Sequence, residues 1–455
     1  MSWRKVTIST FLNERKGRYK PDEAMRMKLK RIDKIDFSNN IHLSETTETK
    51  TDMILVKQGD LVISGINAEK GAIAIYRGEE DIMATIHYSS YTYNEKEIDI
   101  DYLKWFLKSE TFLNTLKEQT KGGIKTELKP NRLLPLEIYL PDKPTQKQIL
   151  KKLNNIEEEV LELEENIDDT AELLQKLRQS ILQDSVKGKL VSQNSQDEPA
   201  TELLKRIRAE KEKLIKQGKI KKEKPLPPIS ESEIPYELPK GWAWCRLGEF
   251  TYIASGSTPN KTEFISSNGI PYLKMYNLVD QKIDFGYRPQ FITQKIHFRM
   301  KRSVAFPGDV IMNIVGPPLG KIAIVPDDYP EWNMNQALVV IRPLVKKLSE
   351  FVYISLCEGS EIEKIVTKGM AGQDNISTTK CRNLLFPFPP LAEQNRIVEK
   401  VNELMTLCAS LEKEIAHSRQ EADCLLNAIL RETFQQKKPK DYSLSETPIS
   451  IAAEE

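Results

Sequence analysis

Two long stretches of the chain place apolar residues at alternating steps of four and three. The first runs from Ile149 to Ile181 and the second from Ile397 to Ile429. A mean step of 3.5 residues keeps such positions on one face of a helix, which is the pattern of a coiled-coil seam. The first seam is expected to comprise Ile149, Leu153, Ile156, Val160, Leu163, Ile167, Thr170, Leu174, Leu177 and Ile181.

The second seam copies the first at an offset of 248 residues. It comprises Ile397, Val401, Leu404, Cys408, Leu411, Ile415, Ser418, Ala422, Leu425 and Ile429. Each copy has one hydroxyl position, Thr170 or Ser418, and a proline-containing entry, residues 140–146 or 388–394. At 1.5 Å per residue the first helix would be about 50 Å long. Because both helices are equally long and carry one narrow stripe, we expect them to pair antiparallel.

The segments before the two helices also repeat. Gly59-Asp60-Leu61-Val62-Ile63 resembles residues 308–312, and Gly71–Ile75 resembles residues 320–324, both at an offset of 249. Each predicts two short strands joined by a turn that contains glycine. The repeat is interpreted as a duplicated unit of one globular part and one long helix, although duplication for stability alone is an alternative.

Each globular part mixes short apolar runs with one helical segment. In the first part we expect strands at Met53–Val56, Leu61–Ile63 and Ala72–Tyr76, and a helix at Asp101–Leu116. In the second we expect strands at Ile270–Met275, Val310–Val315, Ile322–Val325 and Ala337–Ile341, and a helix at Leu348–Val366. The fold class is therefore α+β, with two globular domains and two long antiparallel spacer helices in a pseudo-two-fold repeat.

These patterns divide the chain into six segments. They are a globular domain at 1–142, a spacer helix at 143–192, a charged helix with a proline-rich linker at 193–237, a second globular domain at 238–390, a second spacer helix at 391–436 and a tail at 437–455. Residues 205–224 hold ten Lys/Arg and three Glu. This basic run is expected either to contact DNA phosphates or to form a solvated or protein-docking face.

Composition narrows the function classes. Charged residues make up 29% of the 455 residues but the formal net charge is only +1, so a nucleic-acid surface must be local. The first residues contain no apolar stretch, so we expect no signal peptide, and no run reaches membrane-spanning length. The five cysteines lie in the second half without a C-x-x-C pair, which predicts free thiols.

Basic residues gather in both globular parts, where they can neutralise phosphates while neighbouring polar side chains contact base edges. The DNA-binding candidates of the first part are Arg15, Lys16, Arg18, Tyr19, Lys20, Arg26 and Lys28. Those of the second are Ser257, Thr258, Lys261, Lys274, Tyr276, Asn277, Arg299, Lys301 and Arg302. Lys125 and Gln373 lie in glycine-rich loops that either hold a phosphate or serve only as helix-entry turns.

No catalytic or metal-ligating constellation is found in the sequence. It lacks an Asn-Pro-Pro-aromatic motif, and Ile322 stands where a phosphate-binding loop at Gly316–Lys321 would need Ser or Thr. The four histidines, His42, His87, His297 and His417, have no metal-ligand spacing. We therefore expect a binding subunit with no catalytic residue, rather than a self-contained nuclease or methyltransferase or a scaffold without DNA specificity.

The chain resembles the specificity subunits of type I restriction–modification enzymes. The resemblance rests on residues 388–397 before the second helix, on Gln179–Leu182 with Val186–Leu190 after the first, and on Leu238–Trp242 with Gly256-Ser257-Thr258-Pro259. The first copy departs from the pattern, because residues 15–34 stand where the family has a Gly-x-Thr-Pro loop.

The resemblance implies a mechanism. Each globular part would be a target-recognition domain for one half of a bipartite double-stranded DNA site, and the helices would set the spacing. Two methyltransferase subunits would dock on the helices and use S-adenosylmethionine, and two restriction–translocase subunits would use ATP and magnesium. The chain itself would bind none of these cofactors and no membrane, and would act in the cytoplasm of a bacterium or archaeon.

Overall fold

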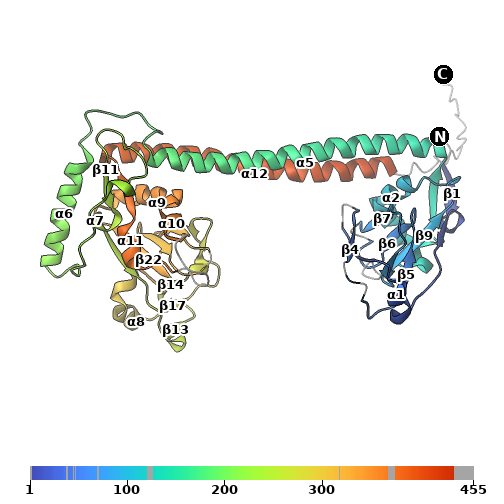
Figure 1. Cartoon of the computed structure of the whole chain (residues 1–455), viewed down its shortest axis with the longest axis horizontal. Coiled ribbons are helices and arrows are strands. Elements are labelled where there is room, and N and C mark those ends of the chain that lie inside the picture. The colour runs from blue at the N-terminus through green and yellow to red at the C-terminus, as the bar shows by residue number, and fades with distance from the viewer. Residues whose placement is uncertain are drawn as a thin grey trace, which may run out of the picture. The chain divides into compact units, whose positions relative to one another are not determined.

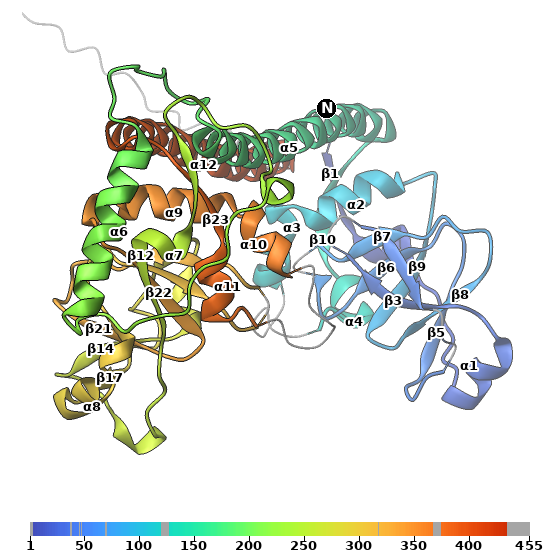
Figure 2. The same cartoon turned by 60° about the vertical axis from the view of Figure 1, so that its left-hand side comes forward.

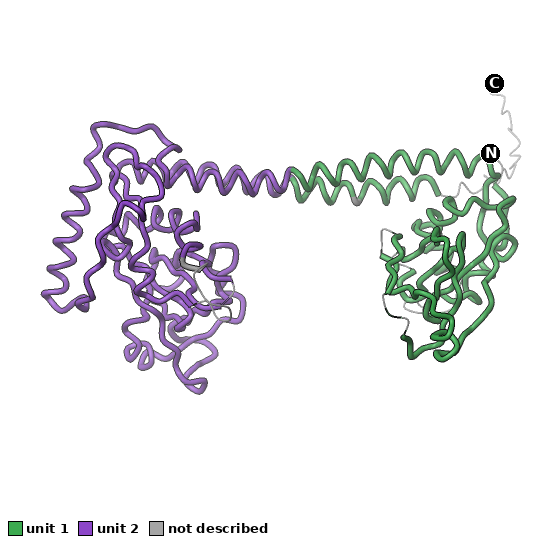
Figure 3. The backbone as a smooth tube through the Cα atoms, in the orientation of Figure 1, with its two compact units in different colours: residues 1–169, 415–455 green, residues 170–414 purple. Residues whose placement is uncertain are grey.

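The computed structural model describes residues 3–36, 39–44, 46, 48–68, 71–119, 127–316, 318–366 and 375–434 (Figure 1). The chain divides into two compact units, unit 1 with residues 1–169 and 415–455 and unit 2 with residues 170–414 (Figure 3). The division falls within both long helices, α5 (Lys143–Val186) and α12 (Leu391–Phe434). Each unit therefore contains one globular part and half of each long helix.

The globular part of unit 1 is built on two four-stranded sheets. The first is antiparallel, in the order β2 (Leu12–Glu14), β9 (Tyr88–Tyr93), β6 (Leu61–Ser64) and β7 (Ile73–Ile75). The second has the order β4 (Ile41–Ser44), β3 (Arg31–Ile35), β8 (Ile82–Thr85) and β5 (Met53–Val56), and its β3–β8 pair is parallel. β1 (Trp3–Thr7) pairs with β10 (Glu137–Pro141), the strand that leads into α5.

Unit 2 repeats this topology strand for strand. Its antiparallel sheet has the order β12 (Thr251–Ser255), β22 (Leu338–Pro343), β19 (Val310–Asn313) and β20 (Ile322–Ile324). Its second sheet has the order β13 (Phe264–Ile265), β17 (Phe291–Ile292), β14 (Ile270–Leu273), β21 (Trp332–Met334) and β18 (Val304–Ala305), with β14 and β21 parallel. β11 (Ala243–Arg246) pairs with β23 (Leu385–Phe388), which leads into α12. The strand β13 and the hairpin β15–β16 (Leu278–Val279, Lys282–Ile283) are additions.

The predicted strands are confirmed, but each predicted helix of the globular parts is two helices. In unit 1, α2 (Ile100–Lys108) and α3 (Glu110–Gln119) break at Ser109, whose Oγ accepts the N–H of Phe112 at 3.2 Å and starts a new helix. In unit 2, α9 (Ser349–Glu358) and α10 (Ser360–Val366) break at Gly359, whose φ of 88° ends the first helix. The remaining α-helices of the described chain, besides the two long ones, are α1 (Pro21–Met27), α4 (Pro130–Leu133), α6 (Ala200–Lys216), α7 (Leu247–Phe250), α8 (Gln294–Arg299) and α11 (Thr378–Asn383).

The central strand β6 shows how the layers of unit 1 pack. Leu61 and Ile63 face a core formed with α2 and the end of α12, whereas Val62 faces the core formed with the second sheet. Both faces of the strand are therefore buried, which explains why its sequence is a continuous apolar run rather than an alternating one.

The two long helices pair antiparallel within each unit. Arg419 forms an ion pair with Asp168 in unit 1, and Arg178 with Glu412 at 2.8 Å in unit 2. α5 begins at the predicted residue 143 but ends at Val186 rather than at residue 192, because Gly188 adopts a left-handed φ of 66° and terminates the helix. α12 begins at the predicted Leu391.

The repeat extends to the entry of each long helix. The amide of Gln146 donates to the carbonyl of Pro141 at 2.9 Å, and the amide of Gln394, 248 residues later, donates to the carbonyl of Pro389 at 2.8 Å. Both glutamines are buried. The proline-containing entries thus form one duplicated helix start.

The predicted seam is only half correct. Residues spaced by seven are buried, namely Leu153, Val160, Ile167, Leu174 and Ile181 on α5 and Val401, Cys408 and Ala422 on α12. The alternate positions Leu163, Leu177, Leu411 and Leu425 are 40–50% exposed, while Ile149, Ile156 and Leu404 are half-buried and Ile397 is buried. The periodicity predicted the correct face of each helix. However, pairing two helices buries only the row of residues spaced by seven and leaves most of the alternate positions at least partly exposed.

Two further expectations can be compared with the structure. All five cysteines are free thiols, as predicted. Among the helices that the structure describes, none is long and apolar enough to cross a membrane.

Candidate functional site

The loop that follows β12 in unit 2 is held close to the neighbouring turn. A Cβ at Gly256 would lie 1.9 Å from the carbonyl oxygen of Asn335, so only glycine fits there. The N–H of Ser257 donates to Met334 at 3.0 Å, and the Ser257 carbonyl accepts the Tyr272 hydroxyl at 2.6 Å. These bonds fix the loop and leave the side chain of Thr258 exposed.

Lys274 and Tyr276, both predicted DNA-binding residues, are brought together on the same face of unit 2. The Lys274 ammonium lies 5.0 Å from the ring centre of Phe264 and 6.0 Å from that of Tyr276. Partial burial lowers the pKa of Lys274. The Tyr276 ring lies 5.9 Å from Tyr287, which the sequence patterns did not single out.

This face continues to α8 through an ion pair. The Arg299 guanidinium donates to the Glu263 carboxylate at 2.6 Å, and the Glu263 carboxylate also accepts the Asn260 N–H at 2.8 Å. We define the loop cluster as Ser257, Thr258, Lys261, Phe264, Lys274, Tyr276, Tyr287 and Arg299. Phe264 and Tyr287 were missed because their partners Lys274 and Tyr276 are distant in sequence; the signal available was aromatic residues interleaved with cations between 264 and 288.

Asn277 does not have the role that its sequence position suggested. It is 1% exposed, and its amide donates to the carbonyls of Asp284 at 3.1 Å and Tyr287 at 3.0 Å. Its Oδ1 accepts the Lys274 N–H at 2.9 Å. The side chain is used to shape the loop that carries Lys274 and Tyr276, so we correct its assignment from base contact to loop support.

The basic stretch of unit 1 surrounds the short helix α1. The Glu23 carboxylate accepts the Lys20 N–H at 2.9 Å at the helix start, and Lys28 ends the helix with a left-handed φ of 54°. Tyr19 exchanges backbone hydrogen bonds of 2.9 and 2.8 Å with Met53, which attaches this segment to β5. We define the α1 cluster as the exposed cations Lys16, Arg18, Lys20, Arg26 and Lys28, for which no ion pair is found within the described part of the chain.

Arg15 precedes this cluster in the sequence, but its side chain is paired with a buried carboxylate. Its guanidinium donates to both carboxylate oxygens of Asp60, at 2.5 and 2.6 Å, and the Asp60 side chain is 2% exposed. This hydrogen-bonded pair raises the pKa of Arg15. In unit 2 the equivalent Asp309 is bound at 2.6 Å by Arg342, which lies on β22, whereas Arg15 directly follows β2. Arg15 is therefore corrected from a phosphate contact to a partner of the repeated buried aspartate.

Lys301 and Arg302 follow α8 in a short 3-10 turn and are exposed. Lys301 lines a groove apart from the loop cluster, together with Phe298 and Phe306. Lys125 and Gln373, predicted from the glycine-rich loops, lie outside the residues that the structure describes.

The basic connector helix α6 lies along the globular part of unit 2 (Figure 2). The Lys211 ammonium donates to the carbonyls of Gly248 at 2.5 Å and Thr251 at 2.9 Å, and Arg208 donates to Glu249 at 2.8 Å. Burial lowers the pKa of Lys211. Arg208 and Lys211 are therefore used to pack α6 against the globular part of its own unit, whereas Lys219 and Lys221 are exposed.

Potential metal ligands do not gather in the residues whose placement is described: no group of three or more His, Cys, Asp or Glu side chains suitable for a metal is found there. His297 is buried in unit 2, with its Nε2 3.0 Å from a carboxylate oxygen of Glu331 and its Nδ1 3.2 Å from the amide nitrogen of Asn333. These contacts join α8 to β21.

Comparison with protein families decides the classification. Residues 2–173 and 239–418 match the family model described as the type I restriction modification DNA specificity domain. The chain belongs to this type I specificity family. Its two matched regions each contain one globular part and the first portion of the long helix that follows, which agrees with the duplication seen in the fold.

Relatives within the type I specificity family include named subunits. The chain is 36% identical over 265 residues to the type I restriction enzyme EcoAI specificity subunit of Escherichia coli, a match covering 56% of this chain and 44% of the relative. It is 32% identical over 266 residues to the EcoEI specificity subunit, covering 56% and 45%. These matches thus span less than half the length of either relative. The MjaVIII specificity subunit of Methanocaldococcus jannaschii is 24% identical over 384 residues, covering 83% and 79%.

Solved structures share the fold along nearly the whole chain. The HsdS subunit from Thermoanaerobacter tengcongensis aligns with a TM-score of 0.53 and 18% identity, over 95% of this chain and 96% of that chain. A chain from a study of complex assembly and conformational transition of the type I R-M system aligns with a TM-score of 0.66 and 18% identity, over 95% and 97%. The two-domain fold with paired spacer helices is therefore that of the type I specificity family.

Proposed function

We propose that this chain gives sequence specificity to a type I restriction–modification complex, with each globular part recognising one half of a bipartite double-stranded DNA site. The observation that carries the proposal is one strand topology present twice with two unlike surfaces, the α1 cluster in unit 1 and the loop cluster in unit 2. A duplicated frame with different surfaces suits a target whose two halves differ in sequence.

The two surfaces suit DNA by different chemistry. The α1 cluster presents five exposed cations, which attract phosphates and make affinity fall as salt rises. The loop cluster adds hydroxyl groups and aromatic rings beside Lys274 and Arg299, and these groups can contact base edges in a groove. Phosphate contacts position the protein, whereas contacts to base edges specify sequence.

The exposed leucines of the long helices support a second part of the proposal, that two methyltransferase subunits dock there. We define patch 1 as the exposed Leu163 of α5 and Leu425 of α12, both in unit 1, and patch 2 as the exposed Leu177 of α5 and Leu411 of α12, both in unit 2. The patches are copies at an offset of 248 residues, since Leu411 corresponds to Leu163 and Leu425 to Leu177. Exposed apolar patches of this kind mark protein interfaces. Two equivalent patches favour two copies of one partner.

The proposal assigns the chemistry to the partners. The methyltransferase subunits would use S-adenosylmethionine on adenine, and two restriction–translocase subunits would use ATP and magnesium. This chain would bind none of these three cofactors. The complex would act on DNA in the cytoplasm, without a membrane partner. The absence of an Asn-Pro-Pro-aromatic motif and of a complete phosphate-binding loop from the sequence supports this division.

Partner docking is tested by co-expressing the chain with the adenine methyltransferase subunit of its own type I system and counting subunits by native mass spectrometry. The expected complex holds two methyltransferase copies. Leu163→Glu with Leu425→Glu should leave one copy, Leu177→Glu with Leu411→Glu should also leave one, and all four together should leave none. Glu164→Gln, an exposed change on α5, is the control. Two copies retained by the fourfold variant would contradict the docking proposal.

DNA specificity is tested by mapping methylated adenines in cells with and without the gene. Deletion should remove methylation at one split motif and no other. Lys274→Ala with Tyr276→Ala should relax the sequence requirement in only one half of that motif. Unchanged methylation after deletion, or methylation by the purified chain alone, would refute the proposed function.

A further inference from the structure

An open groove in unit 2 is separate from the loop cluster and has no role in the function proposed above. It lies between the connector segment after α6 and the segment formed by α8 and the following turn, and has a volume of about 490 Å³. Pockets of this size hold small molecules or single side groups of a polymer. A double helix is too wide to enter it.

Aromatic rings are exposed in this groove. Phe298 is 59% exposed and Phe306 is 38% exposed, although apolar side chains of this size are normally covered. Phe298 was not singled out by the sequence, because its neighbours Lys295, Arg299 and Lys301 dominate that stretch. Two partly exposed rings in one groove suit a ligand with a flat apolar face.

Arg342 adds a second flat surface. Its guanidinium lies 4.6 Å from the ring centre of Phe306 and 5.6 Å from that of Tyr252. Its orientation is fixed, because it donates to Asp309 at 2.6 Å and to the carbonyl of Val304 at 2.9 Å. A planar group cannot rotate away from the groove under these restraints, so it is ready for stacking.

Cations line the same groove. Lys219, Lys221 and Lys301 are exposed, and no ion pair is found for them among the residues that the structure describes. The carboxylate of Glu331, which pairs with His297 at 3.0 Å, also lines it. The groove therefore offers stacking faces, three ammonium groups and one acceptor for an amino group, which together match a nucleobase and its phosphate.

We infer that this groove binds a nucleotide of a single DNA strand, with its base stacked on Phe298 and Phe306 and its phosphate on Lys219, Lys221 and Lys301. Stacking on aromatic side chains requires a base with a free face, which single strands supply and paired duplex bases do not. Lys301, predicted from sequence as a DNA contact, belongs to this groove. The site is independent of duplex recognition by the loop cluster.

The test is fluorescence anisotropy of the full-length chain with a short labelled single-stranded oligodeoxynucleotide. Phe298→Ala should weaken binding roughly fivefold to a hundredfold, the range for loss of one base–aromatic stack. Phe298→Tyr should retain it. Lys219→Ala with Lys221→Ala should reduce the slope of log affinity against log salt by roughly 0.7 for each lysine that contacts a phosphate.

Matched controls separate this site from general charge and from the proposed function. Lys213→Ala with Lys216→Ala removes two lysines of α6 outside the groove, and Leu407→Ala removes an exposed apolar side chain of unit 2; both should bind as the wild type does. Methylation of the target duplex should be unchanged by Phe298→Ala.

Two outcomes would overturn the inference. The first is equal affinity of Phe298→Ala and wild type for the single strand. The second is binding of a free mononucleotide as tightly as the oligodeoxynucleotide, which would exclude the strand as the ligand.

Discussion

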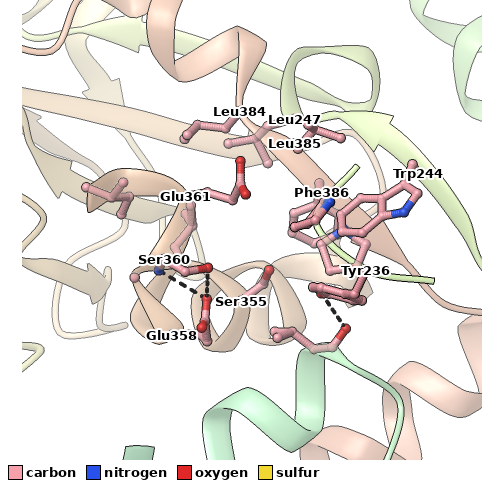
Figure 4. A pocket seen from close by; sticks show the side chains of 16 residues that line it. Tyr236, Trp244, Leu247, Ser355, Glu358, Ser360, Glu361, Leu384, Leu385 and Phe386 are labelled. Atoms are coloured by element: carbon pink, nitrogen blue, oxygen red, sulfur yellow. Dashed lines mark hydrogen bonds between the residues drawn. The ribbon is translucent and has the colours of Figure 1, made fainter. Parts of the chain in front are cut away.

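In each unit the end of one long helix packs against the globular part, but different residues make this contact in the two units. In unit 1 the end of α12 supplies Phe434, whose ring lies 5.6 Å from those of Tyr102 and Phe106. In unit 2 the position 248 residues earlier, at the end of α5, is Val186. Beside it, Tyr236 from the proline-rich linker packs on Trp244 at 5.1 Å and donates its hydroxyl to the Val186 carbonyl at 3.1 Å (Figure 4).

The linker that supplies Tyr236 is itself fixed. Arg246, almost fully buried, donates to the Glu233 carboxylate at 2.9 Å and to the carbonyls of Pro228 at 3.1 Å and Asn383 at 2.9 Å. Where unit 1 has the large side chain of Phe434 on the helix, unit 2 thus has the smaller Val186 on the helix and the ring of Tyr236 from the linker, which lies outside the repeat. The duplicated frame therefore keeps the contact between a helix end and the globular part, although different residues provide that contact in the two units.

The largest expected effect comes from removing the ring in unit 1. Phe434→Ala should reduce the free energy of unfolding of unit 1 by about 3–5 kcal/mol, because a fully buried ring leaves a cavity. Val186→Ala should cost unit 2 only about 1.5 kcal/mol, the value of two methyl-sized groups. Hydrogen exchange of α2 and α9 measures the two units separately. If the two variants lost equal amounts of protection from exchange, this would contradict the idea that Tyr236 contributes to the packing around Val186 in unit 2.

The repeated buried aspartates come next. Asp60→Ala and Asp309→Ala should each cost about 3 kcal/mol, because an arginine is left without its carboxylate. Arg15 follows β2 and Arg342 lies on β22, which are not equivalent positions of the repeat, so similar costs would show that the aspartate, not the source of the arginine, is the shared element. Chemical denaturation of the full chain provides the measurement, with the exposed Asp327→Ala as the control. A negligible cost in either unit would refute the equivalence.

A smaller effect should distinguish the two surfaces that we propose to bind DNA. Arg26→Ala in the α1 cluster should weaken binding to all duplexes alike and lower the salt slope by about 0.9, as expected for one lost phosphate contact. Lys274→Ala should cost about 1 kcal/mol and relax specificity in one half-site. Binding titrations of the methyltransferase-bound complex against half-site substitutions at several salt concentrations measure both. The same uniform loss for both variants would remove the assigned difference between the surfaces.

The smallest effect concerns pH. Hydrogen bonds from the Ser230 backbone and then from Arg246 lower the pKa of Glu233 from 4.5 to about 2. Because the folded-state pKa is depressed, the stabilisation is present above pH 4.5 and is lost as pH falls towards 2. The linker amides of unit 2 should therefore lose protection from hydrogen exchange as pH falls from 4.5 towards 2. In Glu233→Gln this loss of protection should be smaller. Hydrogen exchange around Tyr236 reports it, and an identical pH profile for the variant would contradict the assignment.

The sequence predicted what depends on local periodicity. The starts of α5 and α12, the strands around Leu61 and Val310, and the duplication were all correct. Periodicity assigns a face to a helix but not the width that a partner covers, so Leu163 and Leu411 were expected to be buried and are exposed. The continuous helix expected at Asp101–Leu116 failed because the buried hydroxyl of Ser109 starts a new helix.

The candidate site was less predictable because it depends on contacts between distant segments. Residue type alone could not show that Arg15 binds Asp60 or that the amide of Asn277 turns inward. Equally, nothing local placed Phe264 against Lys274 or Phe298 in a groove with Lys219. Lys274 and Tyr276, both predicted as DNA-binding residues, do lie together, because a single residue separates them along the chain.

The duplicated glutamines at the helix entries have a consequence for how such chains can change. Gln146 bonds only to main-chain atoms: the carbonyls of Pro141 and Glu97 and the N–H of Asp99. Gln394 likewise donates to the main-chain carbonyl of Pro389. A joint that depends on main-chain atoms constrains few of the side chains directly before it. Replacing the globular part of unit 1 at this joint would still require a match to the other helix end, because Phe434 of α12 packs on Tyr102 and Phe106.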